Sequence, residues 1–575
     1  MALGVPSSSP AVVIKEIDAS ASIRTAGTTI GGTVGDFRWG PVGEPITVAT
    51  ETELVGTFAA PDDANAVEFH SVAYFLRYAD NMKVVRTTDA NAKNAFDADS
   101  AGAAPAVGNQ TDWDAQESTL AAANHTFVGK YPGALGNGLT VSVCPADETT
   151  FDGWAYKSDF DTFPGTSTQA AAEGASNDEV HVAVVDANGN FGPKGGVLET
   201  FAHVSLATNA KTPDGSTNYV VNVVNAGSAY VWMAGFGTAG SRFDADAGSA
   251  LASGKNYLTT PAATLDIDLS GGVNQNANTA GTLATAFDQL EDEDTVALDI
   301  LFTAGMSARS DHVTVVNDIV ATAVARKDCI AVASPARSDV VGVANPATIV
   351  TNTMLTAKDM TFGSYLVVDN NFLKVYDKYN DKFIHIPAAS STAGIMAATD
   401  NNAAPWISPA GTRRGNYLGI TSLAYSPTKA QRDTLYKGSV NPIANLPGQG
   451  VMLYGDKTHM NRPSAFDRIN VRRLFTSLEK AIGEFAKASL FEINDEFTRA
   501  EFVNNVEPLL REVKGRRGLT DFKVICDETN NTASVIDRNE FVATIFLKPA
   551  RSINFITLNF VATRTGADFE EVVGI

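Results

Sequence analysis

The sequence is poor in cysteine, and the few cysteines it has are badly placed for cross-links. Only three occur among 575 residues, Cys144, Cys329 and Cys526. Their number is odd and they lie roughly 190 residues apart, which fits neither a disulfide framework nor a paired metal-binding knuckle. We expect all three to be reduced, buried and to pack as small apolar side chains.

Long apolar runs and a surplus of basic charge are also lacking. No run reaches the roughly 18 apolar residues that cross a bilayer, and the opening MALGVPSSSP has neither the basic end nor the apolar stretch of a secretory signal. With 65 acidic against 43 basic residues, the formal net charge is -22. Because this charge repels phosphates, we expect no nucleic-acid partner and no stable membrane insertion, and a protein made in a cytoplasm.

Motifs for catalysis or cofactor binding are missing as well. GxSxG, HExxH and EF-hand patterns do not occur. In the nearest approach to a phosphate loop, GSALASGKN at 248–256, five residues separate the glycines instead of four, and Asn256 stands where a hydroxyl would bind magnesium. The seven histidines do not cluster, and the acidic stretch 291–294 is typical of a solvated turn. We therefore expect no enzyme, no metal and no cofactor, although a carboxylate pair stays possible among 65 acids.

The residues that are present predict a multidomain protein of mixed α+β and α/β class. Hydrophobic residues make up 44% of the chain, enough for three or four cores of ordinary size. A buried strand near 295–305, helical apolar spacing from Val313 to Val324, and a second apolar run at 329–332 predict a parallel, right-handed βαβ unit. Hairpins are predicted at 179–191 and 364–387.

The clearest predicted helix covers 467–490. At 100° per residue its apolar side chains share one arc, while five basic residues occupy the opposite side. These basic residues are Arg468, Arg472, Arg473, Lys480 and Lys487. Residues 461–520 carry eleven Lys and Arg against nine Asp and Glu, whereas 1–460 carry 27 against 48. The basic side of the helix is either an ordinary solvated face or a docking ridge for an acidic partner.

A second helix is expected at 495–515, followed by three β-rich runs, 522–527, 541–549 and 553–563, spaced for an antiparallel sheet. The final stretch then has no evident place in its own fold. Its apolar residues are Phe569, Val572, Val573 and Ile575. Since termini fray unless something holds them, this tail is predicted to pair with another molecule. The start of the chain, with Val12, Val13, Ile14 and Ile17, is predicted to be an extended arm.

Several segments resemble the contractile tail sheath proteins of T-even-like myoviruses. FRWGPVGEPITVATETELVGTF at 37–58 is similar to the start of that family, and KYPGALGNGLTVSV at 130–143 to its middle. The longest similar stretch is VICDETNNTASVIDRNEFVATIFLKPARSINFITLNFVATRTGADF at 524–569. The resemblance covers both ends and most of the middle, and is weakest at 93–180 and 235–265.

The resemblance implies a structural subunit of a contractile phage tail. Six subunits would form a ring, and rings would stack helically around a tail tube. Contraction from a metastable extended state would then drive the tube through the host envelope for genome delivery. The implied domains are a linking arm at 1–22, a discontinuous middle domain at 23–92 and 345–425, and inserted outer domains at 93–344, with 93–180 the most peripheral. An inner sheath domain at 426–564 and a second linking arm at 565–575 complete the chain.

The resemblance also assigns roles and partners. The two arms would exchange strands between subunits, through Val12, Val13, Ile14 and Ile17 at one end and Phe569, Val572, Val573 and Ile575 at the other. The basic helix, Arg468, Arg472, Arg473, Lys480 and Lys487, would face the tube. The implied partners are further copies of the chain and the tail tube, baseplate and tail terminator proteins, with no cofactor. The implied location is the tail sheath of the virion, after assembly in the host bacterial cytoplasm.

Two alternatives remain open on the sequence. A phage-tail-like bacteriocin or a secretion system uses a similar sheath, and capsid genes beside this gene would exclude both. A cytoplasmic carbohydrate-active enzyme could share the size and acidity, but it should contain a deep pocket with paired carboxylates.

Overall fold

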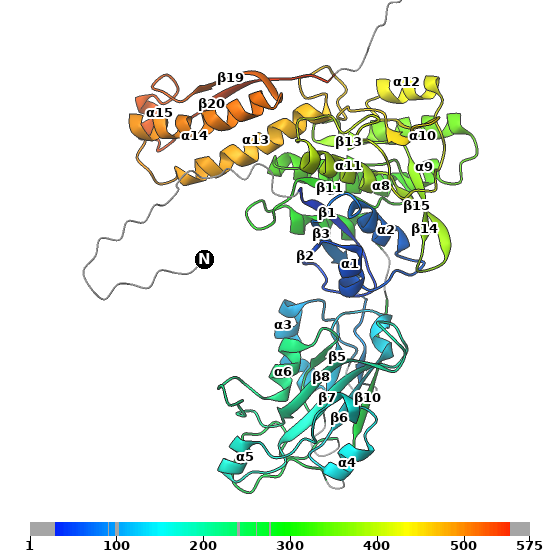
Figure 1. Ribbon diagram of the computed structural model, residues 1–575, viewed down its shortest axis with the longest axis vertical. Coiled ribbons are helices and arrows are strands. Elements are labelled where there is room, and N and C mark those ends of the chain that lie inside the picture. Colours follow the sequence, from blue (N-terminus) through cyan, green and yellow to red (C-terminus); the bar gives the residue numbers. More distant parts are fainter. Residues whose placement is uncertain are drawn as a thin grey trace, which may run out of the picture. The chain divides into compact units, whose positions relative to one another are not determined.

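The computed structural model describes residues 29–89, 91–97, 103–237, 242–259, 262–274 and 278–552 (Figure 1). The described residues divide into two compact units, 29–484 with 549–552, and 485–548. We call them the larger and the smaller unit. Both predicted arms, 1–22 and 565–575, and the predicted strand 553–563 lie outside the described residues.

A six-stranded sheet forms the centre of the larger unit, in the order β13-β12-β11-β1-β3-β2 (Figure 1). The strands are β1 (Gly31–Asp36), β2 (Pro45–Val48), β3 (Met82–Thr87), β11 (Ile300–Phe302), β12 (Ile330–Ala333) and β13 (Leu366–Val368). All neighbours pair in parallel except β2, which is antiparallel to β3. The five parallel strands are short and almost wholly buried, as is typical of a parallel sheet covered on both faces.

Helices cover both faces of this sheet. Those around it are α1 (Glu51–Phe58), α2 (Ala66–Phe75), α7 (Ala280–Phe287), α8 (Arg309–Arg326), α9 (Arg337–Val340), α10 (Pro346–Asp359) and α11 (Ala389–Asn402). Leu301 packs into one core with α7, α8 and α10, while its neighbours Ile300 and Phe302 pack into another with α2 and α11. This alternation follows from the two-residue period of a strand. The predicted parallel βαβ unit is confirmed as β11, α8 and β12.

The strand order of the six-stranded sheet places one domain boundary differently from the sequence prediction. The sequence analysis placed 93–344 in the inserted outer domains, whereas β11 and β12 lie in the same sheet as β1 and β3. Gly31 of β1 pairs directly with Ile300 of β11. The difference arises because periodicity identifies a strand but does not say which distant strand it pairs with. The segment that leaves this sheet therefore returns before β11, not at 344.

The inserted segment forms a seven-stranded sheet in the order β8-β7-β6-β10-β4-β5-β9 (Figure 1). Its strands are β4 (Phe96–Asp97), β5 (Phe127–Gly129), β6 (Leu139–Cys144), β7 (Glu179–Asp186), β8 (Gly196–Ser205), β9 (Val231–Met233) and β10 (Leu265–Ser270). Its helices are α3 (Gln110–Ala122), α4 (Glu148–Gly153), α5 (Thr168–Glu173) and α6 (Val220–Gly227). The pairs are antiparallel. Strands β7 and β8 form a hairpin, but β8 lies beyond the predicted range 179–191, because the connecting loop runs from 187 to 195.

Two small sheets complete the larger unit. One contains β14 (Phe372–Asp377), β15 (Lys382–Pro387) and β16 (Ser422–Leu423), and confirms the second predicted hairpin. The other pairs β17 (Ile443–Leu446) with β18 (Gly450–Leu453), beyond α12 (Lys429–Lys437). Helix α13 (Ile469–Ala488) follows, and its last residues belong to the smaller unit.

The smaller unit contains α14 (Glu496–Gly515), β19 (Leu519–Ile525), α15 (Ala533–Asp537) and β20 (Thr544–Pro549). Asp495 caps α14, its side chain accepting a 2.8 Å hydrogen bond from the Thr498 amide. The helix buries Phe502, Val506 and Leu509 at helical spacing. The predicted helix 495–515 is therefore confirmed.

Two further expectations concern the whole described chain. Cys144, Cys329 and Cys526 are free and buried, as predicted. Among the described residues, none of the helices combines the length and the apolar composition needed to span a membrane.

Candidate assembly site

Helix α13 begins in the interior of the larger unit. Its residues from Ile469 to Leu474 are buried on all sides of the helix, including the two arginines that were predicted to face a partner. Arg472 is 6% exposed and Arg473 5%. Since buried charges need partners, the residues around these arginines decide what α13 can do.

Arg473 forms a buried ion pair with Asp400 of α11. Its Nη2 donates to Asp400 Oδ2, and both side chains are almost fully enclosed. The hydroxyl of Thr29, two residues before β1, donates to the same oxygen at 2.8 Å. Burial raises the pKa of Asp400 to about 6, although Arg473 and Thr29 oppose the rise. One carboxylate oxygen thus joins the first described residue to α13.

Two turns further along α13, Lys480 makes a second contact of the same kind. Its Nζ lies 3.0 Å from Oδ1 of Asp299, the residue before β11. The other oxygen of Asp299 accepts a 2.8 Å hydrogen bond from the backbone amide of Ile30. We call Asp299 and Asp400, with the four groups that they bind, the aspartate clamp.

The remaining arginines at the start of α13 also have internal partners. The Arg472 guanidinium lies over the rings of Tyr365 and Phe466, 4.3 and 4.1 Å from their centroids. Burial lowers the pKa of Arg472. Arg468 bonds to Asp456 at 3.2 Å and to the hydroxyl of Tyr436 at 2.6 Å.

The predicted basic face is therefore not one solvated ridge. Arg468, Arg472, Arg473 and Lys480 point at groups within the larger unit, and Lys487 is the exposed member of the set. The apolar arc of α13 was identified correctly, but the opposite side faces aspartates and aromatic rings that come from distant segments. Contact between any of these residues and a tail tube stays a prediction.

The smaller unit carries large apolar side chains on its surface. The turn between α13 and α14 exposes Leu490, Phe491 and Ile493, and the first turn of α14 exposes Phe497, with 76% of its surface accessible. Strand β20 adds Phe546. Within the described residues, β20 pairs with β19 alone. Because a two-stranded sheet is marginal in water, its open edges and these side chains make the smaller unit a candidate for contact with another chain.

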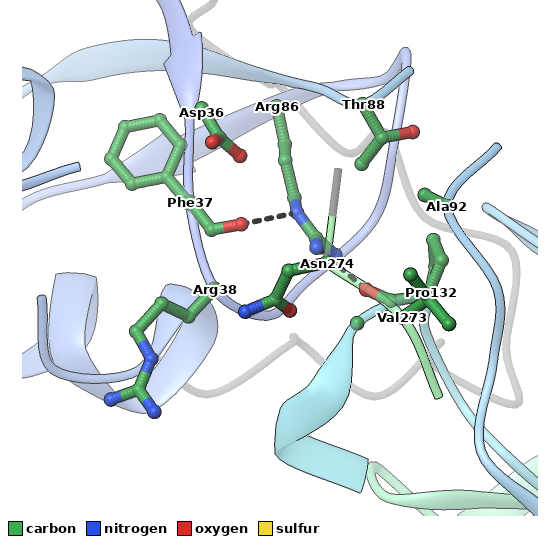
Figure 2. Close-up of a pocket in the computed structure, with 10 residues that line it drawn as sticks. Asp36, Phe37, Arg38, Arg86, Thr88, Ala92, Pro132, Val273 and Asn274 are labelled. Carbon is green, nitrogen blue, oxygen red and sulfur yellow. Dashed lines mark hydrogen bonds between the residues drawn. The ribbon is translucent and has the colours of Figure 1, made fainter. Parts of the chain in front are cut away.

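A buried arginine joins the two large sheets. Figure 2 shows Arg86, at the end of β3, directed between the backbone of Phe37 and that of Pro132, which belongs to the inserted segment. Its Nε donates to Phe37 O at 2.8 Å, and Nη1 and Nη2 donate at 2.7 Å to the carbonyls of Gly40 and Pro132. Burial lowers the pKa of Arg86 to about 10, and burial raises that of the neighbouring Asp36 to about 7.

Similarity to known proteins decides the family. Residues 276–459 match the central domain of phage tail sheath proteins, and 461–563 match their C-terminal domain. The tail sheath protein of Enterobacteria phage T4 is 32% identical over 99% of this chain and 99% of the relative. That of Vibrio phage KVP40 is 31% identical over 98% and 99%. The chain belongs to the phage tail sheath family. It is a structural component of a contractile tail and hence of the virion.

The fold of this sheath protein is also seen in a solved relative. The sheath tail protein of Listeria innocua superposes with a TM-score of 0.52 at 12% identity, covering 91% of this chain and 96% of that one. This agreement confirms the mixed α and β class predicted from the sequence. It extends over the inserted segment as well as over the conserved domains, because it spans most of both chains.

The residues that organise α13 in this sheath protein were not predicted from the sequence. Thr29, Asp299 and Asp400 were not singled out, and neither was Arg86. Two of them did leave a signal. Asp400 is the one charged residue in α11, a helix of mostly small residues, and Arg86 follows two valines near the end of β3. A charge next to small or apolar residues, which pack in the interior, indicates that it has a buried partner elsewhere.

Proposed function

We propose that this sheath subunit assembles in six-fold rings, and that the rings stack helically around a tail tube. Contraction from a metastable extended state would drive the tube through the host envelope and deliver the genome. The observation that carries the proposal is the similarity to two phage tail sheath proteins over 98% and 99% of the chain. A match of this extent includes every domain of the chain.

Strand exchange between subunits is the proposed link within the lattice. The arms at 1–22 and 565–575 would add strands to sheets of neighbouring subunits, where backbone hydrogen bonds hold the strand and alternate side chains set its register. The open sheet of β19 and β20 supports this, because it has unpaired edges within the described residues. Each bond contributes only about 1 kcal/mol, so cohesion would come from many copies.

The proposed partners are further copies of the chain and the tube, baseplate and tail terminator proteins. Assembly in the host bacterial cytoplasm, without nucleic acid and without stable membrane insertion, is part of the same proposal. We propose no catalysis and no cofactor, because the energy for contraction can be stored as kinetic stability of the extended lattice. The named relatives are structural tail proteins, in agreement with this.

Electron microscopy of the purified full-length protein, alone and with its tube protein, tests the proposal. We expect rings or tubes with six-fold symmetry, longer and more regular in the presence of the tube. A protein that stays monomeric at high concentration in both samples would overturn the proposal. A bacteriocin or secretion-system sheath would also assemble, so the genes beside this one, capsid genes or none, separate these relatives from a virion.

A further inference from the structure

The aspartate clamp brings together two parts of the chain that are far apart in sequence. Thr29 and Ile30 lie where the N-terminal segment enters the six-stranded sheet, and Arg473 and Lys480 lie on α13. Seven residues separate the two cations, which is almost two turns, so they project from the same side of the helix. Each aspartate accepts one hydrogen bond from the entry segment and one from α13.

The two contacts at Asp400 are not independent. Thr29 and Arg473 donate to the same oxygen, and the carboxylate has little access to water that could replace a lost donor. Among the described residues, Arg473 Nε and Nη1 have no hydrogen-bond partner. The charge of this buried guanidinium is therefore balanced through the contact of Nη2 with Asp400. An ion pair in the interior loses much of its value when its hydrogen bonds are incomplete. Loss of the Thr29 hydrogen bond should therefore weaken the ion pair between Asp400 and Arg473.

The charge state of Asp400 adds to this dependence. Its pKa, about 6, already lies near neutrality, and the Thr29 hydroxyl is one of the groups that lower it. The charged or titratable groups that act on it are Arg473 and Asp299, the second of which raises its pKa. Loss of the Thr29 bond therefore raises the pKa further and increases the fraction of Asp400 that is protonated at pH 7. A protonated Asp400 no longer neutralises Arg473.

We propose that the aspartate clamp is a positioning device, through which the attachment of the N-terminal segment at residues 29–30 controls how firmly α13 is held. The inference rests on the proposed role of residues 1–22 as a linking arm. A force on that arm would act first on Thr29 and Ile30 and weaken their hydrogen bonds to Asp400 and Asp299. The ion pairs of these aspartates with α13, whose end continues into the smaller unit, would weaken in turn. Asp299 acts in parallel, because the Ile30 amide and Lys480 hold its two oxygens in place.

Hydrogen–deuterium exchange of the full-length soluble protein tests the coupling. Thr29→Val removes the hydroxyl and keeps the shape of the side chain. We expect amides of α13 between 472 and 480 to exchange about tenfold faster, the change that accompanies loss of a hydrogen bond to a charged group. Thr29→Ser should restore the slow exchange. Thr47→Val, which alters an exposed hydroxyl of β2, is the matched control and should leave α13 unchanged.

Either of two results would overturn the proposal. If Thr29→Val speeds exchange only in β1 and α11 while α13 keeps its rate, the clamp does not couple the two segments. If Thr29→Ser exchanges as fast as Thr29→Val, the hydroxyl is not the link. Both readouts concern the soluble subunit, so they stand even if the arms do not exchange strands. Conversely, failure of the protein to form rings, with the coupling intact, would count against the proposed function alone.

Discussion

At the residue scale, the buried carboxylates differ in how far their partners offset the loss of water. Asp369, at the end of β13, accepts hydrogen bonds from Ser334 Oγ at 2.8 Å and Thr392 Oγ1 at 3.1 Å, but burial still raises its pKa to about 7. Asp97 is equally enclosed. Burial opposes its ionisation too, yet His125, 3.5 Å away, and hydrogen bonds from the Thr126 amide and Arg242 hold its pKa below the usual value. Neutral donors alone do not compensate fully for lost water.

Asp369 therefore predicts a pH-dependent contribution to stability. Between about pH 4 and pH 7 the folded carboxyl binds a proton more readily than the unfolded one, so the parent protein loses stability as pH rises through this window. The amide side chain of the Asp369→Asn variant does not titrate. We expect the free energy of unfolding of this variant, relative to that of the parent, to increase by on the order of 1–3 kcal/mol as the pH rises from 5 to 7.5. Urea unfolding at both pH values measures this difference.

The exposed Asp161→Asn serves as the control for that experiment, since its carboxyl is solvated in both states. Its stability relative to the parent should be the same at the two pH values. Parallel pH profiles for Asp369→Asn and Asp161→Asn would show that the interior does not disfavour the Asp369 charge.

At the element scale, helix α13 changes character along its length. Its first two turns are surrounded by the larger unit, whereas Glu484, Lys487 and Ala488 near its end are exposed. Basic residues occur in both halves, Arg472 and Arg473 in the first and Lys480 and Lys487 in the second. What differs is the surroundings, because Asp400 of α11 and Asp299, the residue before β11, face only the part of the helix that lies in the larger unit.

Charge reversal at the two ends of α13 should therefore have different consequences. Arg473→Glu places a second carboxylate beside buried Asp400, and we expect it to destabilise the protein by about 3–5 kcal/mol, as when one partner of a buried pair is removed. Lys487→Glu should change stability by about 0.5 kcal/mol or less, as at other surface positions. Thermal unfolding of both variants measures the contrast.

The same pair of variants separates folding from tube binding. If Lys487 contacts an acidic tube, Lys487→Glu should assemble less well on the tube and normally without it. A stable, normally assembling Arg473→Glu would contradict the buried pair and restore the interpretation of this arginine as a surface residue.

At the scale of the whole molecule, the chain combines a closely packed framework with a smaller unit that is incompletely covered. The six-stranded and seven-stranded sheets bury their apolar residues internally, and Arg86 ties them together. The smaller unit instead leaves Phe497 and the edges of its sheet uncovered within the described residues. A subunit of a contractile lattice needs this division, because domains must keep their shape while the contacts between subunits change.

Removal of residues 565–575 should separate folding from assembly. We expect a soluble, folded monomer that forms no rings or tubes, because the sequence predicts that the deleted tail pairs with another subunit. Circular dichroism reports folding, and electron microscopy and sedimentation report assembly. Normal tubes from the truncated protein would exclude strand exchange through this arm.

A finer comparison keeps the tail at full length. Replacing Phe569, Val572, Val573 and Ile575 by Ala removes the apolar side chains that would set the register of an added strand. Replacing Glu570 and Glu571 by Gln is the matched control in the same segment. Assembly should fail in the first variant and survive in the second, whereas equal behaviour would assign the tail no side-chain-specific role.

The family and most of the local structure can be predicted from the order of the amino acids alone. The βαβ unit, the hairpin of β14 and β15, the two C-terminal helices and the burial of the cysteines follow from periodicity, capping and composition, which act over a few neighbouring residues. The match of the long segment ending near 569 with tail sheath proteins likewise requires no knowledge of contacts.

Which strands share a sheet, and which cations are exposed to solvent, depends on contacts between distant segments and is seen only in the folded chain. Thr29 and Asp400 are 371 residues apart, and β1 joins β11 across the whole inserted segment. Arg473 and Lys487 look alike on a helical wheel, yet one is enclosed against Asp400 and the other is exposed. Helical spacing orients a side chain on its own element, whereas the charge and polarity that it meets come from segments folded against it, and these are set by packing over the whole domain.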